Sequence, residues 1–112
     1  MGISRMYTGD DGETHIEDLD LDTHSELTEL MATKGIVFRS APAGHFSDWH
    51  PAPRRQFVIT LSGEVEIGLG DGSLYRYGPG HVNLAEDVTG RGHTTRVVGD
   101  VPRVTATVQL QD

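Results

Sequence analysis

The sequence predicts an all-β protein folded as an antiparallel sandwich or barrel. Strand-like segments recur at roughly 8–12-residue spacing, which is typical of such folds. The 112 residues include 14 glycines and 5 prolines, a composition that indicates many turns. Residues 64–69 alternate polar and apolar side chains, as a half-buried strand does. Closing many short strands into a barrel or packing them as two sheets removes exposed strand edges, which favours this architecture.

The N-terminal third differs from the rest of the chain. Residues 1–35 are acidic and weakly patterned, and we predict an arm that forms an edge strand or exchanges between two copies in a dimer. Residues 14–21 alternate imperfectly and are predicted to form a strand. The pattern Thr23-x-x-Glu26 resembles a capping box, which predicts a short helix over 25–33 ending before Gly35. An extended conformation of that segment is almost as well supported.

Residues 36–112 are predicted to form the barrel. Runs of β-branched and aromatic residues are separated there by glycine-containing turns, among them the hairpin signal Gly70-Asp71-Gly72. No linker divides the chain, so we expect one domain with an attached arm. The predicted strands of the barrel are 36–39, 56–61, 64–69, 73–77, 81–85, 93–98 and 103–109.

Composition excludes several classes of function. The chain has no cysteine, which excludes disulfides, thiolate metal sites and a cysteine nucleophile. Seventeen acidic against nine basic residues leave a net charge of −8, which argues against a nucleic-acid surface. The apolar runs are too short to cross a membrane, and residues 1–5 lack the apolar core of a signal peptide. We therefore expect a cytoplasmic protein that binds neither nucleic acid nor membranes.

Two of the six histidines are placed to line a pocket. A single histidine is more often a polar surface residue than a ligand. However, His50 lies just before a predicted strand and His93 begins another, positions that point inward near the mouth of a small barrel. If His50 faces inward, alternation predicts that these residues share its face: Ala52, Gln56, Val58 and Thr60. Phe57, Ile59 and Leu61 then face a second layer or a partner. This face would carry one imidazole, one carboxamide and small side chains. Such a composition is more typical of a pocket than of a densely packed core.

Further polar and aromatic residues near the predicted mouth are candidate ligand-binding residues. Arg54 and Arg55 are able to orient a substrate carboxylate through paired hydrogen bonds, although a solvated pair at a strand end is the simpler interpretation. Glu86 and Asp87 precede His93 and are candidates for a general base or for a partner of an imidazole, or else they cap their own loop. Trp49 is able to wall the pocket or to pack in the core.

The spacing of these residues resembles that of the cupin superfamily. Its first motif is matched in spacing by Gly44, five residues, His50, one residue, Ala52, three residues, Gln56, six residues, Gly63. Gly78-Pro79-Gly80-His81-Val82 looks like the entry of the second motif, and Gly90-x-x-His93 looks like its end, with a slightly longer gap between them. The runs 48–56 and 84–96 also look like small bacterial single-domain cupins of uncharacterised function. The resemblance covers about residues 36–110 and implies a double-stranded β-helix, or jelly-roll barrel.

The same resemblance implies a metal site that this chain has partly lost. Cupins typically bind one divalent metal through three histidines and a glutamate. His50 matches the first histidine and His93 the last, whereas Ala52 and Gln56 stand where a histidine and the glutamate would be. The implied metal ligands are therefore His50, Gln56 and His93, for Zn, Fe, Mn or Ni. A set with a neutral amide in place of a carboxylate binds such ions less firmly.

The resemblance leaves two functions open. One is a metal-dependent enzyme of the isomerase, decarboxylase, dehydratase or oxygenase class that acts on a small polar or anionic organic molecule. The alternative is a metal-free small-molecule binding module with a degenerate metal site. In either case we expect a homodimer, because the polar segment 1–22 carries strand-like residues but cannot form a core of its own, and cupins commonly pair through edge strands.

Overall fold

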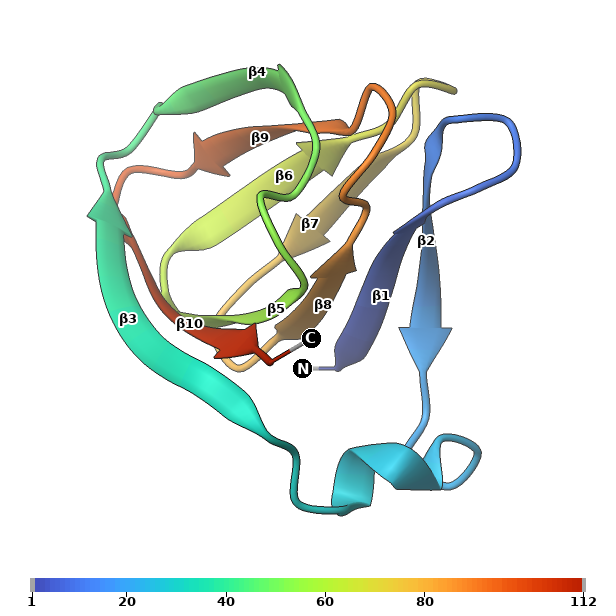
Figure 1. The fold of residues 1–112 in the computed structure, drawn as a ribbon. Coiled ribbons are helices and arrows are strands. Elements are labelled where there is room, and N and C mark those ends of the chain that lie inside the picture. Colours follow the sequence, from blue (N-terminus) through green and yellow to red (C-terminus); the bar gives the residue numbers. More distant parts are fainter. Residues whose placement is uncertain (1, 112) are drawn as a thin grey trace.

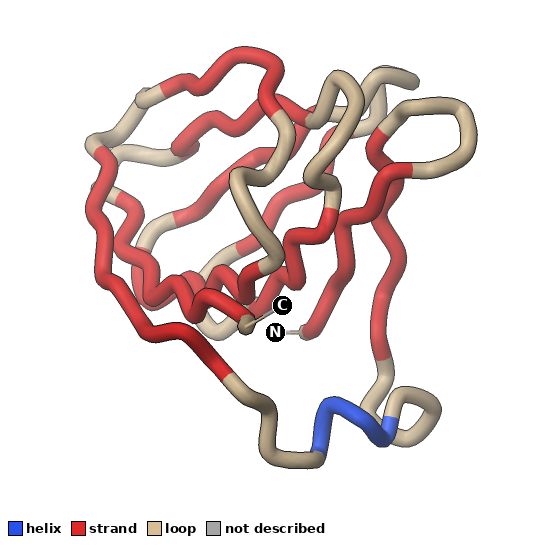
Figure 2. Tube along the Cα trace, in the orientation of Figure 1, coloured by secondary structure: helices blue, strands red, loops and turns tan. Residues whose placement is uncertain are grey.

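The computed structural model describes residues 2–111, and within them the chain forms ten strands and one short 3-10 helix (Figure 1). The all-β prediction is confirmed, and strands dominate the trace in Figure 2. In chain order the strands are β1 (Ile3–Thr8), β2 (Thr14–Leu19), β3 (Thr33–Ala41), β4 (Phe46–His50), β5 (Gln56–Ser62), β6 (Glu64–Gly68), β7 (Leu74–Tyr77), β8 (Val82–Glu86), β9 (His93–Val98) and β10 (Arg103–Leu110).

Two sheets face each other and enclose the interior (Figure 1). The larger has six strands in the order β2-β1-β8-β5-β10-β3, and the smaller has four in the order β4-β9-β6-β7. Every neighbouring pair for which a register is defined is antiparallel except β1 and β8, which run parallel. The two edges of the larger sheet are therefore β2 and β3.

The N-terminal segment contributes to the larger sheet. β1 lies between β2 and β8, with Ile3 opposite Val82 and Met6 opposite Ala85. The strand predicted at 14–21 is confirmed as β2, whereas β1 and β4 were not predicted, and His50 ends β4 rather than preceding a strand. The division into an arm of residues 1–35 and a barrel of residues 36–112 stays a prediction, as does an exchange of the arm between copies.

The segment 25–33, for which helix and strand were both considered, is mostly neither. Ser25–Thr28 form one turn of 3-10 helix (η1), and β3 then begins at Thr33. The expected capping box does not form, since no side chain caps the helix and Thr23 Oγ1 donates to the carbonyl of Asp20 instead. η1 has no buried residue, so no packed apolar face extends it into a longer helix.

Alternation along β5 and β6 places the core between the sheets. Val65 and Ile67 of β6 are buried, while Glu66 faces outward to Arg76. Val58 and Thr60 of β5 face the interior and Leu61 is exposed, as predicted. The alternation from His50 was wrong as a reason, since His50 ends β4 in the other sheet and the loop 51–55 separates it from β5. The buried apolar cluster consists of Met6, Ala52, Val65, Ile67, Leu69, Tyr77 and Ala85. Within residues 2–111 no helix has the length and apolarity that a membrane crossing requires.

Candidate functional site

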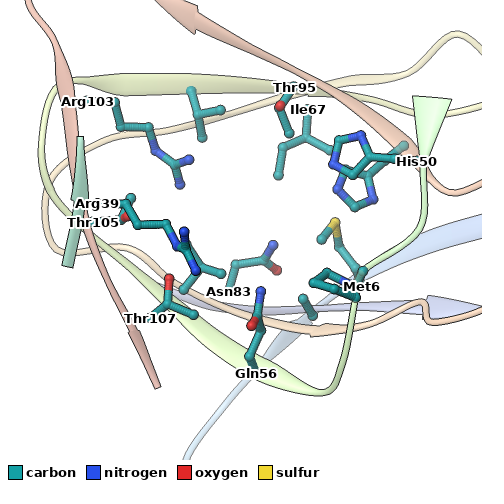
Figure 3. A pocket seen from close by; sticks show the side chains of 16 residues that line it. Met6, Arg39, His50, Gln56, Ile67, Asn83, Thr95, Arg103, Thr105 and Thr107 are labelled. Atoms are coloured by element: carbon teal, nitrogen blue, oxygen red, sulfur yellow. The ribbon is translucent and has the colours of Figure 1, made fainter. Parts of the chain in front are cut away.

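A cavity of about 270 Å³ lies between the two sheets. It is somewhat below the range of roughly 300–1,000 Å³ that holds drug-sized ligands, so a small molecule is the appropriate size of occupant. Figure 3 shows how the side chains enter it from several strands. Its wall consists of Met6, Arg39, His50, Ala52, Pro53, Gln56, Val58, Val65, Ile67, Asn83, Ala85, His93, Thr95, Arg103, Thr105 and Thr107.

The imidazoles of His50 and His93 converge on this cavity. The two residues are opposite each other in the ladder between β4 and β9, and their ring centroids are 4.7 Å apart with the planes tilted by 56°. Gly92 makes this approach feasible. Its φ of +80° is in the left-handed region, and a Cβ at this position would overlap the backbone carbonyl of His50. A glycine is therefore needed beside His93 for the two imidazoles to meet.

A buried carboxylate fixes the orientation of His93. His93 Nδ1 lies 2.6 Å from Asp87 Oδ2, and that oxygen also accepts a hydrogen bond of 2.8 Å from Thr14 Oγ1. Asp87 is completely buried, and its backbone carbonyl accepts from the amide of Ala52. Because a carboxylate accepts, His93 Nδ1 carries a proton in this contact, and in the neutral imidazole Nε2 is the nitrogen with the lone pair.

His50 has the same tautomer for a different reason. Its Nδ1 lies 2.6 Å from the backbone carbonyl of Asp48, and a carbonyl is only able to accept. Nδ1 therefore donates, and in the neutral imidazole His50 Nε2 is the nitrogen with the lone pair. In their neutral forms, both imidazoles thus have the lone pair at Nε2. Such lone pairs are able to accept a hydrogen bond, to take up a proton or to bind a metal ion.

The opposite side of the cavity is cationic. Arg39 of β3 and Arg103 of β10 extend toward the centre of the cavity from the side facing His50 (Figure 3). Arg103 Nη2 donates to Thr60 Oγ1 at 3.1 Å, while its Nε is buried without a partner among residues 2–111. Burial lowers the pKa of Arg103 to about 10, so the side chain is still protonated at neutral pH.

The candidate residues from the sequence divide into two groups. His50, Gln56 and His93 line the same cavity. The others, which are Trp49, Arg54, Arg55 and Glu86, do not contribute to its wall. The Trp49 ring packs against Arg91, whose Cζ lies 4.3 Å from the ring centroid.

Arg55 and Glu86 belong to an ion-pair group at a second hollow. Glu86 accepts from Arg5 Nε at 2.5 Å and from Arg55 Nε at 2.7 Å. Burial raises the pKa of Glu86, but the hydrogen bonds from Arg5 and Arg55 more than offset this and leave it below its ordinary value. Glu86 therefore forms ion pairs with these arginines, and Asp87 is the carboxylate that contacts the imidazole of His93. Arg54 lines a separate surface hollow with Lys34.

Comparison with solved structures decides the fold. No protein-family model matches the sequence, and no curated protein matches it either. A protein with a double-stranded β-helix domain from Klebsiella pneumoniae superposes with a TM-score of 0.53 at 24% identity, over 67% of this chain and 64% of that one. A cupin domain from Bordetella pertussis has a TM-score of 0.53 at 16% identity, over 69% and 80% of the two chains.

The chain has the double-stranded β-helix fold of the cupins. The resemblance found in the sequence is thereby confirmed at the level of the fold. A cupin-superfamily protein from Silicibacter pomeroyi, described as a sugar phosphate isomerase, superposes with a TM-score of 0.52 at 18% identity over 91% of this chain. This chain spans 61% of that protein and less than two-thirds of the Klebsiella protein.

Tested against the cupin metal set, the donors present fit only in part. His50 and His93 have the hydrogen bonds to Nδ1 that metal-bound histidines usually make. The remaining two positions hold Ala52, which has no donor, and Gln56, which is neutral. Within the described part of the chain, no three His, Cys, Asp or Glu residues come together in a group able to hold a metal ion. The donor set therefore does not fit a firmly held resident metal.

Several residues that line this cavity were not identified from the sequence pattern alone. Arg39 and Arg103 lie at the ends of two predicted strands, and only the strand pairing shows that both face the cavity. Asn83 of β8 also lines the cavity, and Thr14 reaches Asp87 from β2. Alternation within 103–109 could have suggested Arg103, Thr105 and Thr107 as one face, which the lining of the cavity bears out.

Proposed function

We propose that the protein binds a small polar or anionic organic molecule in the barrel cavity, and that His50 and His93 contact it directly. One observation carries this proposal: the imidazoles of His50 and His93 converge on a cavity between the two sheets. Both imidazoles are oriented by a hydrogen bond at Nδ1, so they are preorganised to contact a ligand through Nε2.

The residues present are able to move a proton unaided. His93 is held by a buried carboxylate, which stabilises the imidazolium formed when Nε2 takes a proton from a bound hydroxyl or activated C–H group. His50 is close enough to share the same ligand. Proton transfer on a small oxygen-containing molecule is therefore the reaction that this cavity supports best. A fold shared with proteins named a sugar phosphate isomerase and a DMSP lyase supports a small-molecule role.

A divalent metal bound by His50, His93 and Gln56 is a second candidate. The observation in its favour is the pair of Nδ1 hydrogen bonds, which leaves both Nε2 atoms free to act as ligands. The metal would supply Lewis-acid chemistry. Because Gln56 is neutral and Ala52 offers no donor, we expect weak binding that is lost on dialysis, with Zn²⁺ or Ni²⁺ held more tightly than Mn²⁺.

Backbone and imidazole NMR spectra would test both candidates. The ¹⁵N-labelled protein would be titrated with a panel of sugars, polyols and short hydroxy acids in chelator, and separately with Zn²⁺, Ni²⁺ and Mn²⁺. We expect saturable shifts at His50 and His93 for at least one organic probe. His50→Gln and His93→Gln should abolish them, whereas His24→Gln, at the N-cap of η1 and outside the cavity wall, should not.

The outcomes separate the two candidates. Saturable binding of an organic probe in chelator supports the metal-free site. Saturable binding that requires a divalent ion and is lost in His93→Gln supports the metal site instead. If no probe and no ion perturbs either imidazole, the cavity is not a ligand site and the proposed function is wrong.

A further inference from the structure

Two arginines lie side by side on the cationic wall of the cavity. Arg39 of β3 is opposite Thr105 of β10, so Arg103, two residues along β10, is its diagonal neighbour on the same face. Diagonal neighbours in an antiparallel pair are typically about 7–8 Å apart, within reach of long side chains. Both side chains extend into the cavity rather than away from it (Figure 3).

These two positive charges are not balanced by the protein around them. The chain has 17 acidic residues and a net charge of −8, yet no Asp or Glu lines this cavity within residues 2–111. In that part of the chain neither Arg39 nor Arg103 forms an ion pair. Like charges on neighbouring strands destabilise a sheet, and a partly buried guanidinium needs an acceptor. Arg103 Nε has none, so an acceptor from outside the chain would satisfy it.

A hydrogen-bond chain orients a further donor into the same space. Ser4 is fully buried, and its hydroxyl donates to Asn83 Oδ1 at 2.9 Å while lying 2.8 Å from His81 Nε2. Because the hydroxyl proton goes to Asn83, Ser4 Oγ accepts from His81 Nε2–H. With Oδ1 occupied, the amide group of Asn83 is left with its NH₂ for the cavity that Asn83 lines. The hydroxyls of Thr105 and Thr107 lie on the same side of the cavity (Figure 3).

We propose that Arg39, Arg103 and Asn83 form a seat for the carboxylate or phosphate group of a small organic anion. This inference rests on the proposed function, because the same molecule would present a hydroxyl or carbonyl group to His50 and His93 on the opposite wall. The ligand class is thus a short hydroxy acid or a phosphate ester. A different hollow of about 240 Å³, next to the cavity, is also lined by both arginines, and Arg39 is exposed. An anion therefore reaches the seat from solvent through this side.

Matched pairs of anionic and neutral probes would test the seat. Lactate would be compared with lactamide, and glycerol 3-phosphate with glycerol, by NMR titration of the ¹⁵N-labelled protein. The Nε–Hε signals of arginine report directly on the two guanidinium groups. The principal variant is Arg39→Gln, since Arg39 is exposed and its loss should leave the fold intact. Arg103→Gln is the second variant. Arg96→Gln is the matched control, because Arg96 lies over Phe46 and outside the cavity wall.

We expect at least one anion to bind with shifts at Arg39, Arg103 and the two cavity histidines. A charge-assisted pair is worth about one order of magnitude in affinity, so Arg39→Gln should weaken binding about tenfold, as should replacing the anion by its neutral analogue. Arg96→Gln should bind as the unmodified protein does. Preference for lactate indicates a carboxylate seat, and preference for glycerol 3-phosphate a phosphate seat.

Two results would overturn the inference, and they differ in what they leave standing. Equal binding of anionic and neutral partners, with shifts at His50 and His93 but an unchanged affinity in Arg39→Gln, refutes the anion seat and retains the small-molecule site. Absence of saturable binding by every anionic and neutral probe refutes both. Shifts that spread over surface residues and persist equally in Arg39→Gln and Arg96→Gln indicate nonspecific attraction, and they also refute the seat.

Discussion

Replacing the buried carboxylate behind His93 tests the organisation of the site most directly. In Asp87→Asn the side chain keeps its size but loses one acceptor and its charge. Asp87 Oδ2 accepts from both Thr14 and His93, whereas Oδ1 has no partner within residues 2–111. If the amide oxygen takes the place of Oδ2, the NH₂ group is buried at the Oδ1 position without an acceptor. If the amide is reversed, NH₂ faces His93 Nδ1–H, and His93 must change its tautomer.

The expected cost follows from these two orientations. Each either leaves a buried donor unsatisfied or replaces a charge-assisted hydrogen bond, and either loss costs about 1.5–3 kcal/mol. For a domain of this size, a loss of 1 kcal/mol lowers Tm by about 4 °C, so Asp87→Asn should melt about 6–12 °C below the unmodified protein. Asp22→Asn, at an exposed position, should change Tm by no more than about 1–2 °C.

Thermal melting by circular dichroism gives the stability, and long-range ¹H–¹⁵N spectra of the imidazoles give the tautomer. We also expect Thr14→Val and Asp87→Asn to be non-additive, because both remove the same hydrogen bond. An Asp87→Asn variant that has the same Tm as the unmodified protein and keeps His93 protonated at Nδ1 would contradict the role given to Asp87. Strict additivity with Thr14→Val would contradict the contact between them.

Three further predictions concern the fold and its assembly. Burial lowers the pKa of His81 below its usual 6.5, so protonation favours the unfolded chain. The contribution of His81 to the free energy of unfolding is complete above pH 6.5 and decreases as the pH falls from there toward the lowered pKa. A series of Tm measurements at different pH values should show this decrease, and His81→Gln should make the dependence on pH weaker. Gly92→Ala should destabilise the protein by several kcal/mol because its Cβ overlaps the His50 carbonyl, whereas Gly72→Ala, also at positive φ but with open space, should cost about 1 kcal/mol in urea unfolding. The expected homodimer should appear by light scattering, and Phe38→Lys on the exposed edge strand β3 should shift it toward monomer; an unmodified protein that is monomeric at micromolar concentration would refute this.

Most strands of the barrel were predictable because their burial follows alternation. The predicted strands at 56–61, 93–98 and 103–109 differ from the observed ones by at most one residue at either end. β1 was missed for a physical reason. Its buried positions are Ser4 and Met6, and Ser4 is buried only because Asn83 and His81 satisfy its hydroxyl. A sequence pattern cannot show a partner that lies on a distant strand.

The candidate site was predictable as far as alternation and motif spacing reach. The spacing of His50, Gln56 and His93 placed all three on one cavity. Arg54 and Arg55 were chosen because they flank the entry of the strand at 56–61, but Arg55 pairs with Glu86 at another hollow. The arginines that do reach the cavity, Arg39 and Arg103, are brought together by the pairing of β3 with β10. That strand pairing is a tertiary property, and it cannot be predicted from the composition or from the spacing of motifs.

The parallel pairing of β1 with β8 delays the placement of β1 in the barrel. Ser4 and His81 are 77 positions apart, and Met6 on the same first strand forms part of the cavity wall. A ribosome must therefore complete β8 before β1 finds its place in the sheet, whereas the β6–β7 hairpin is able to form as soon as it emerges. The cavity is therefore complete only after β9 and β10 have followed β8, and the proposed ligand would stabilise the closed barrel rather than its early hairpins.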